Sequence, residues 1–316
     1  MRCPVCGDGD PIRTHAAREM QLGTRDEFMY AECGRCASLW LTNPPEDMAP
    51  YYESSGYVPF TESVKPESGL RRVAKAAMTD LVARGVIRRR RHWTYTLYLA
   101  DARKRDRILD VGSGSGHFLV MLRQRGYRSA VGVDPFARPS PFVQRGTIDD
   151  VRGQFDLIFF NDSLEHVPDP FDTLTSAAKR LTEEGRIVVK VPLADSHAWR
   201  VYGVNWFALE APRHFTLPTR QGIKIVAERA GLRVSKAVDD SNALQFWASE
   251  LYLRGIPFTE NHGFSEEQIQ AWEREAETLN YRNEGDHGLF VLRPGQDGLR
   301  GAIVKDSGDR GRLVDT

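Results

Sequence analysis

The stretch LDVGSGSGHFL (109–119) decides how the central part of this 316-residue chain folds. Its first residues are typical of a buried β-strand, and glycines at 112, 114 and 116 then predict a tight turn before a helix begins. Glycine lets the backbone approach a ligand closely, and the start of a helix offers N–H donors to an anionic group. A strand that passes through such a turn into a helix is therefore a candidate cofactor loop.

Short β-branched runs alternate with helical stretches around this loop. The candidate strands cover residues 107–112, 129–134, 142–148, 155–161, 186–192, 232–239 and 287–294. Helices are predicted over 219–230 and 266–282. The alternation is typical of an α/β fold with a doubly wound, mostly parallel sheet, and we expect the last strand to pair antiparallel at the sheet edge.

The spacing of the glycines restricts the class of cofactor. The pattern is G-x-G-x-G, whereas a dinucleotide fingerprint needs its third glycine at position 117, which is His117 here. Asp134 follows Gly112 by 22 residues, where a carboxylate can accept hydrogen bonds from both hydroxyls of a ribose. An adenosine cofactor other than NAD is favoured, and the alternative is a tight turn that binds no ligand.

Four motifs follow one another in the sequence: LDVGSGSG, VGVD, FDLIFFNDSLEHVPDP and LTEEGRIVVKVP. Together they resemble the successive motifs of class I S-adenosylmethionine-dependent methyltransferases, over about residues 105–240. The resemblance implies a seven-stranded sheet and S-adenosylmethionine as cofactor. It also implies that Asp110, Gly112, Gly114 and Gly116 hold the methionine end, Asp134 the ribose, and Ile148 with Asp149 the adenine side, with Asn161 beside the methyl group.

All four cysteines lie near the N-terminus, as Cys3-x2-Cys6 and Cys33-x2-Cys36. Four thiolates can close a tetrahedral shell around zinc, and such a shell leaves no open position for a substrate, so the predicted metal is structural. The near-alternation of apolar and polar residues over 25–41 predicts a short hairpin. We therefore expect a small zinc ribbon over residues 1–42, with a redox dithiol or free thiols as the alternatives.

A subgroup of these methyltransferases, from sugar and natural-product pathways, resembles the chain more widely. Its members join a C-x2-C…C-x2-C zinc segment and an N-P-P…Y-Y stretch to the same core. In this chain the second stretch begins at Asn43, and the segment from Trp206 to PRHF (212–215) is also similar.

The remaining segments are assigned by composition. Residues 43–104 are expected to form a connector and two helices broken near Gly85, residues 105–294 the methyltransferase domain, and residues 295–316 a disordered tail. Forty-three basic residues balance 43 acidic ones, which removes the whole-molecule argument for a polyanionic partner. No apolar run is long enough to span a bilayer and no signal peptide is recognised, so we expect a cytoplasmic protein without a membrane partner.

Two histidines are candidates for the base that removes a proton from the acceptor during methyl transfer. His214, in EAPRHF, is our first choice, and His166, in SLEHVPDP, is the second, with a structural role against the following helix as its alternative. Asp162-x-x-Glu165-His166 also resembles the acid-x-x-Glu-His metal motif of ubiquinone-pathway O-methyltransferases, with Asp in place of the first Glu. Carboxylates at a strand end that only receive helix N–H groups are the alternative to a second metal.

The function that we expect is methyl transfer to a small molecule, either a sugar or a biosynthetic intermediate. The first alternative is an RNA methyltransferase that holds nucleic acid with the ribbon and with the run Arg88, Arg89, Arg90, Arg91. The second is a regulatory or scaffold protein that binds the cofactor without turnover. The oligomeric state and the acceptor atom stay open.

Overall fold

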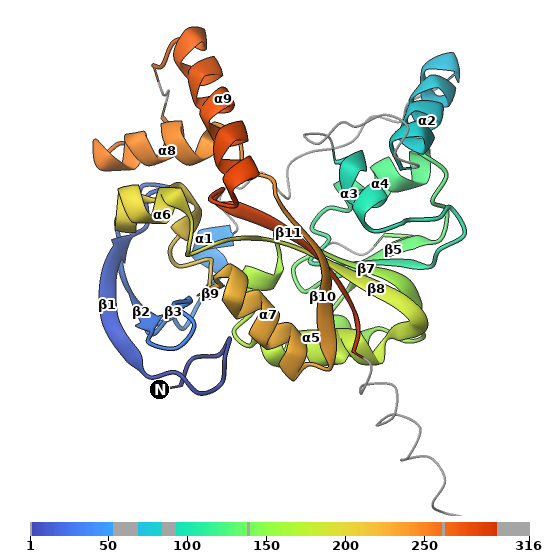
Figure 1. Ribbon diagram of the computed structural model, residues 1–316, viewed down its shortest axis with the longest axis horizontal. Coiled ribbons are helices and arrows are strands. Elements are labelled where there is room, and N and C mark those ends of the chain that lie inside the picture. The colour runs from blue at the N-terminus through green and yellow to red at the C-terminus, as the bar shows by residue number, and fades with distance from the viewer. Residues whose placement is uncertain (1, 53–68, 84–92, 138–139, 261–262, 296–316) are drawn as a thin grey trace, which may run out of the picture.

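A computed structural model describes residues 2–52, 69–83, 93–137, 140–260 and 263–295. A central sheet carries helices on both faces, and a smaller N-terminal sheet lies at one flank, beside α6 (His197–Tyr202) (Figure 1). The expected break near Gly85, the Arg88–Arg91 run and the tail from residue 296 onward lie outside the described residues. No helix in the described part of the chain is both long and apolar enough to cross a membrane.

The central sheet has seven strands, as the sequence predicts. They are β4 (Ile108–Val111), β5 (Ala130–Asp134), β6 (Val143–Arg145), β7 (Phe155–Asn161), β8 (Leu181–Pro192), β10 (Leu232–Asp239) and β11 (His287–Pro294). Their order is β10-β11-β8-β7-β4-β5-β6, and the five strands from β8 to β6 are parallel. The predicted fold class, a doubly wound and mostly parallel α/β sheet, is confirmed.

The prediction for the last strand is correct in direction but wrong in position. β11 runs antiparallel to both neighbours and lies inside the sheet, between β8 and β10. Leu289 to Leu292 are all buried, whereas most residues of β10 are only half-buried. An apolar run such as GLFVL suits an interior position, so β10 takes the edge instead.

Helices cover the two faces of this sheet with separate apolar cores. One face packs against α3 (Thr94–Leu99) and α4 (His117–Gln124), through residues such as Leu97 and Leu122. The other packs against α5 (Pro170–Lys179) and α7 (Arg220–Arg229), through Leu174 and Val226. Besides α6, the other described α-helices beyond these layers are α1 (Ala49–Tyr52), α2 (Gly69–Ala83), α8 (Leu244–Leu253) and α9 (Glu266–Arg282).

The N-terminal sheet contains the predicted hairpin and two further strands. β2 (Glu27–Cys33) and β3 (Leu39–Leu41) form the hairpin, and β1 (Pro11–Arg18) pairs antiparallel with β2. The fourth strand, β9 (Thr216–Leu217), pairs with β3 but belongs to the chain that follows the central sheet's β8. The ribbon, meaning residues 2–42, is therefore joined to the loop that contains PRHF.

Candidate active site

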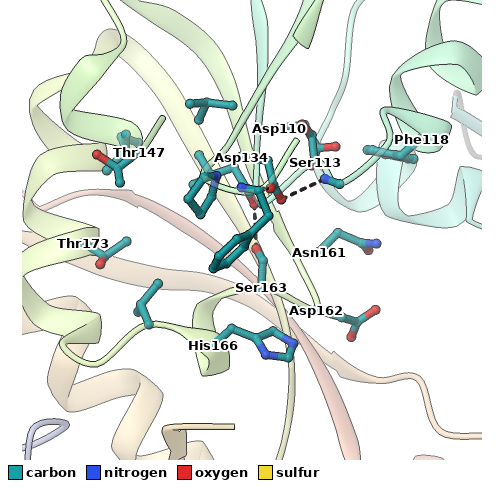
Figure 2. A pocket seen from close by; sticks show the side chains of 18 of the residues that line it. Asp110, Ser113, Phe118, Asp134, Thr147, Asn161, Asp162, Ser163, His166 and Thr173 are labelled. Atoms are coloured by element: carbon teal, nitrogen blue, oxygen red, sulfur yellow. Dashed lines mark hydrogen bonds between the residues drawn. The ribbon is translucent and has the colours of Figure 1, made fainter. Parts of the chain in front are cut away.

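One cavity of about 660 Å³ lies at the carboxyl ends of β4, β5 and β7 (Figure 2). Ligands of open α/β sheets bind at this edge. The cavity is lined by every cofactor residue that the resemblance implies, namely Asp110, Gly112, Gly114, Asp134, Ile148, Asp149 and Asn161, except Gly116. Gly116 is instead the residue before α4, with φ +82°.

The glycine loop has the backbone that its sequence predicts. Gly112 has φ +76°, and a Cβ there would lie 2.5 Å from the Cβ of Ser163. A side chain at this position would therefore need both a disfavoured backbone conformation and a displaced neighbour. Ser163 in turn donates a hydrogen bond to the Val111 carbonyl at 2.6 Å, which ties the end of β7 to the loop.

Two buried carboxyl groups lie beside the loop. Asp134 accepts hydrogen bonds from the backbone N–H groups of Gly114, at 3.0 Å, and Phe136, at 2.8 Å. Each bond uses a different oxygen, so each oxygen keeps a lone pair for a ligand hydroxyl. Burial, and then the charge of Asp134, raises the pKa of Asp110 to about 8. The Asp110 carboxyl therefore keeps its proton to a higher pH than an exposed aspartate does.

A short turn and the end of β7 also line the cavity. Ile148 and Asp149 lie on a single 3-10 turn, which is closed by reciprocal hydrogen bonds between Thr147 and Asp150. Asn161 is the last residue of β7, and Asp162 follows it with φ +52°. The local sequence thus presents one apolar and two polar side chains toward the same cavity.

The sequence analysis did not identify Tyr52, Phe136 and Lys190, which also line the cavity. The Tyr52 and Phe136 rings stack at 5.3 Å between centroids, and Phe136 is 55% exposed. Lys190 lies 3.3 Å from Asp240 and 3.7 Å from Asp162, and Asp162 is the main cause that raises its pKa. The Y-Y dipeptide was the available sequence signal for Tyr52. It could not show that Tyr52 lies beside His166, which is 114 residues away in the chain.

The two candidate histidines lie together, with ring centroids 4.7 Å apart, but only His166 lines the cavity. The Nδ1 of His166 lies 3.0 Å from the Arg213 carbonyl and 3.1 Å from the Tyr52 hydroxyl. His214 is buried behind it, and its Nδ1 lies 2.8 Å from the Ala208 carbonyl. Burial lowers the pKa of His166, and it lowers that of His214 to about 3. Both imidazoles are therefore neutral at pH 7.

The residues of the possible second metal motif are divided between two groups. Asp162 faces Lys190 and His287, at 3.7 and 3.9 Å. Glu165 is buried, and burial raises its pKa well above the usual range. Its Oε2 has no hydrogen-bond partner among the described residues. Ligand atoms of Glu165, His166 and His214 lie within 4.8 Å of one another. Any metal ion here would therefore use His214 rather than Asp162.

The four cysteines are close enough to share one ion. All four are buried and free of disulfides, and the Sγ atoms lie 3.7 Å apart in the pair Cys3–Cys36 and 3.5 Å apart in Cys6–Cys33. Zinc–sulfur bonds of about 2.3 Å in a tetrahedron separate the sulfurs by about 3.8 Å. The N–H groups of Arg35 and Cys36 point at Cys33 Sγ, at 3.4 Å each, as expected around a thiolate. The donor set therefore fits zinc.

Comparisons with known proteins agree on the central domain. A family model described as a methyltransferase domain matches residues 83–237. A tRNA U34 carboxymethyltransferase of Aliarcobacter butzleri is 26% identical over 140 residues, which cover 39% of this chain and 46% of that protein. A protein of the same name from Dichelobacter nodosus is 31% identical over 111 residues, or 30% of this chain and 36% of that protein. The chain thus spans less than half the length of these curated relatives.

Among solved structures, a complex between the Haloferax volcanii Trm112 methyltransferase activator and a putative methyltransferase is similar. The matched chain is 20% identical in sequence, and the match covers 71% of this chain and 96% of that one, with a TM-score of 0.44. The family match, the strand order and the cavity at the carboxyl edge support one classification. The chain carries a class I S-adenosylmethionine-dependent methyltransferase domain.

Proposed function

We propose that this protein transfers a methyl group from S-adenosylmethionine to an acceptor that enters the cavity beside His166. One observation carries the proposal: the glycine loop, Asp134 and the Ile148 turn, which belong to three separate segments, line a single cavity. When bound, S-adenosylmethionine supplies an electrophilic methyl group on a positively charged sulfur. Asp134 would hold the ribose hydroxyls, and the loop N–H groups would face the methionine carboxylate.

RNA is the acceptor that we propose first. The curated relatives are named as enzymes of tRNA U34, and a planar base could stack on the exposed face of Phe136. This reverses the order expected from the sequence, which put a small molecule first. The support is chemical and comparative, since the Arg88–Arg91 run lies outside the described residues.

A small-molecule acceptor remains the second candidate because of the charge of the cavity. Among the described lining residues, Lys190 is the only lysine or arginine, and it is already paired with Asp162 and Asp240. The described lining therefore offers little to bind phosphate groups. A neutral acceptor such as a sugar would not need such groups.

We propose His166 as the base that removes the proton and place His214 second, which reverses the order expected from the sequence. A base must come within hydrogen-bond reach of the group that it deprotonates, and His166 lines the cavity whereas His214 does not.

We also propose that Cys3, Cys6, Cys33 and Cys36 bind one structural zinc ion.

The experiment supplies methyl-labelled S-adenosylmethionine together with either bulk tRNA or the small-molecule extract of cells that lack this protein. Label in tRNA, with transfer that falls steeply as salt is raised, supports the first acceptor class. Label confined to the small-molecule fraction supports the second. The Asp134→Ala variant is the control for both fractions. Label in neither fraction, from a protein that binds S-adenosylhomocysteine, would refute the proposed transfer.

A further inference from the structure

A buried arginine connects the ribbon to the candidate base. The Arg213 side chain is fully buried, and its Nε donates to Glu210 Oε1 at 2.8 Å. Its remaining nitrogens reach the Tyr51 carbonyl at 3.2 Å, Gln21 Oε1 at 2.9 Å and Glu19 Oε1 at 3.2 Å. A buried guanidinium is stable only when its charge is balanced and its donors are used. Here the balancing charges come from two segments, Glu19 and Glu210.

Glu19 belongs to the ribbon, directly after β1, and it is also fully buried. Its carboxylate accepts the backbone N–H groups of Gln21, Leu22 and Thr24, at 3.1, 2.8 and 3.0 Å. These bonds fix the position of the carboxylate before it meets Arg213. The ribbon therefore presents a fixed negative charge to the loop around Arg213, and the two side chains form an ion pair with no exposed surface.

The backbone of Arg213 contacts His166. Its carbonyl lies 3.0 Å from His166 Nδ1 and accepts a weaker bond from the Tyr52 hydroxyl at 3.4 Å. A carbonyl can only accept, so Nδ1 carries the hydrogen and the lone pair lies on Nε2. The next residue is fixed by the ribbon as well, because the Tyr30 hydroxyl donates to the His214 carbonyl at 2.8 Å.

We propose that Arg213 is a positioning residue for His166, and that Glu19 of the ribbon holds it in place. The ribbon then sets the tautomer of the base as well as supporting the fold. This inference rests on the role of His166 proposed above. The groups that face His166 are Tyr52 from α1, Asp162 and Glu165 from its own loop, and Glu210, Arg213 and His214 from the loop before β9.

The test follows the His166 imidazole by ¹⁵N NMR in the full-length protein, with and without S-adenosylhomocysteine, so it needs no acceptor. Its signal is assigned by comparison with His166→Ala. In the wild type we expect the Nδ1–H tautomer. In Glu19→Gln the Arg213 charge is balanced less completely, so the titration midpoint of His166 should move down and the Nε2–H tautomer should appear. Arg213→Met leaves Glu210 uncompensated and should move the midpoint up.

Glu32→Gln is the matched control, because it removes another ribbon carboxylate that pairs with His15 instead. Opposite shifts in Glu19→Gln and Arg213→Met, with none in the control, support the proposal, since a general loss of packing has no reason to change sign. If either variant does not fold, Arg213→Lys keeps the charge but cannot reach all four partners, and it should mix the tautomers. An Nε2–H tautomer in the wild type, or a Glu19→Gln (or Arg213→Lys) spectrum like that of the control, overturns the inference. Methyl transfer is not measured, so failure here is distinct from failure of the proposed function.

Discussion

Removal of the Asp134 carboxylate should weaken the binding of S-adenosylmethionine about a hundredfold. The carboxylate is 6% exposed, and each oxygen already accepts one backbone N–H group, from Gly114 or Phe136. A hydrogen bond to a charged group contributes about 1.5–3 kcal/mol. Loss of two ribose bonds, reduced by the water that can replace the carboxylate in an open cavity, comes to about 3 kcal/mol. That energy corresponds to about two powers of ten in Kd.

Calorimetric titration of Asp134→Ala with S-adenosylmethionine and with S-adenosylhomocysteine measures this effect. Both ligands should lose the same factor, because the ribose is unchanged by transfer and the contact is therefore one of uniform binding. Asp134→Asn keeps one acceptor oxygen, so its affinity for both ligands should lie between those of the wild type and of Asp134→Ala. Asp172→Asn, on the exposed first turn of α5, is the control and should bind normally. NAD should not bind the wild type. An Asp134→Ala affinity within about threefold of wild type would mean that the ribose lies elsewhere.

Three further outcomes are expected. Cys33→Ser should release the proposed zinc, seen as loss of about one equivalent by metal analysis, and should expose the ribbon to protease because metal binding and folding are coupled; retained zinc would disprove the assignment. His166→Ala should lower transfer about a hundredfold, with S-adenosylhomocysteine affinity unchanged in calorimetry, and normal turnover would exclude His166 as the base. Burial lowers the pKa of His214 to about 3, below the unfolded value of about 6.5, so its contribution to stability is present above pH 6.5 and is lost as the pH falls toward 3. Between pH 7 and pH 5, urea unfolding should therefore show wild type losing about 2 kcal/mol more than His214→Gln, and equal losses would contradict neutral burial.

Much of the candidate cofactor side of the cavity could be predicted because its sequence signals are local. The glycine loop, the strand before it and Asp134 lie within one strand–helix–strand unit, and their spacing fixes their arrangement. The helix predicted over 266–282 coincides with α9 (Glu266–Arg282), which has Ser265 at its N-terminus as a side-chain cap. In these segments, hydrophobic period and turn chemistry agree with the tertiary structure.

The side of the cavity proposed for the acceptor could be predicted only in part, because it is built from segments far apart in the chain. Tyr52 comes from the connector, His166 from the loop after β7, and Arg213 from the loop before β9. PRHF drew attention to His214, whose ring lies against His166, but the carbonyl that accepts the hydrogen bond from His166 belongs to Arg213. β9 was not predicted at all, since a two-residue strand has no period to detect.

The short strand β9 restricts how this protein could be divided or recombined. Most of the strand pairing in the ribbon is internal. Its outer strand β3, however, pairs with Thr216 and Leu217 of β9. The Thr219 hydroxyl also donates to the Cys36 carbonyl at 2.6 Å. A shortened protein that begins after residue 42 would leave β9 without its neighbour and Arg213 without the Glu19 charge. Exchange of the ribbon between related enzymes should therefore succeed only when the partner loop from 206 to 219 is transferred with it, so the two segments are expected to change together during evolution.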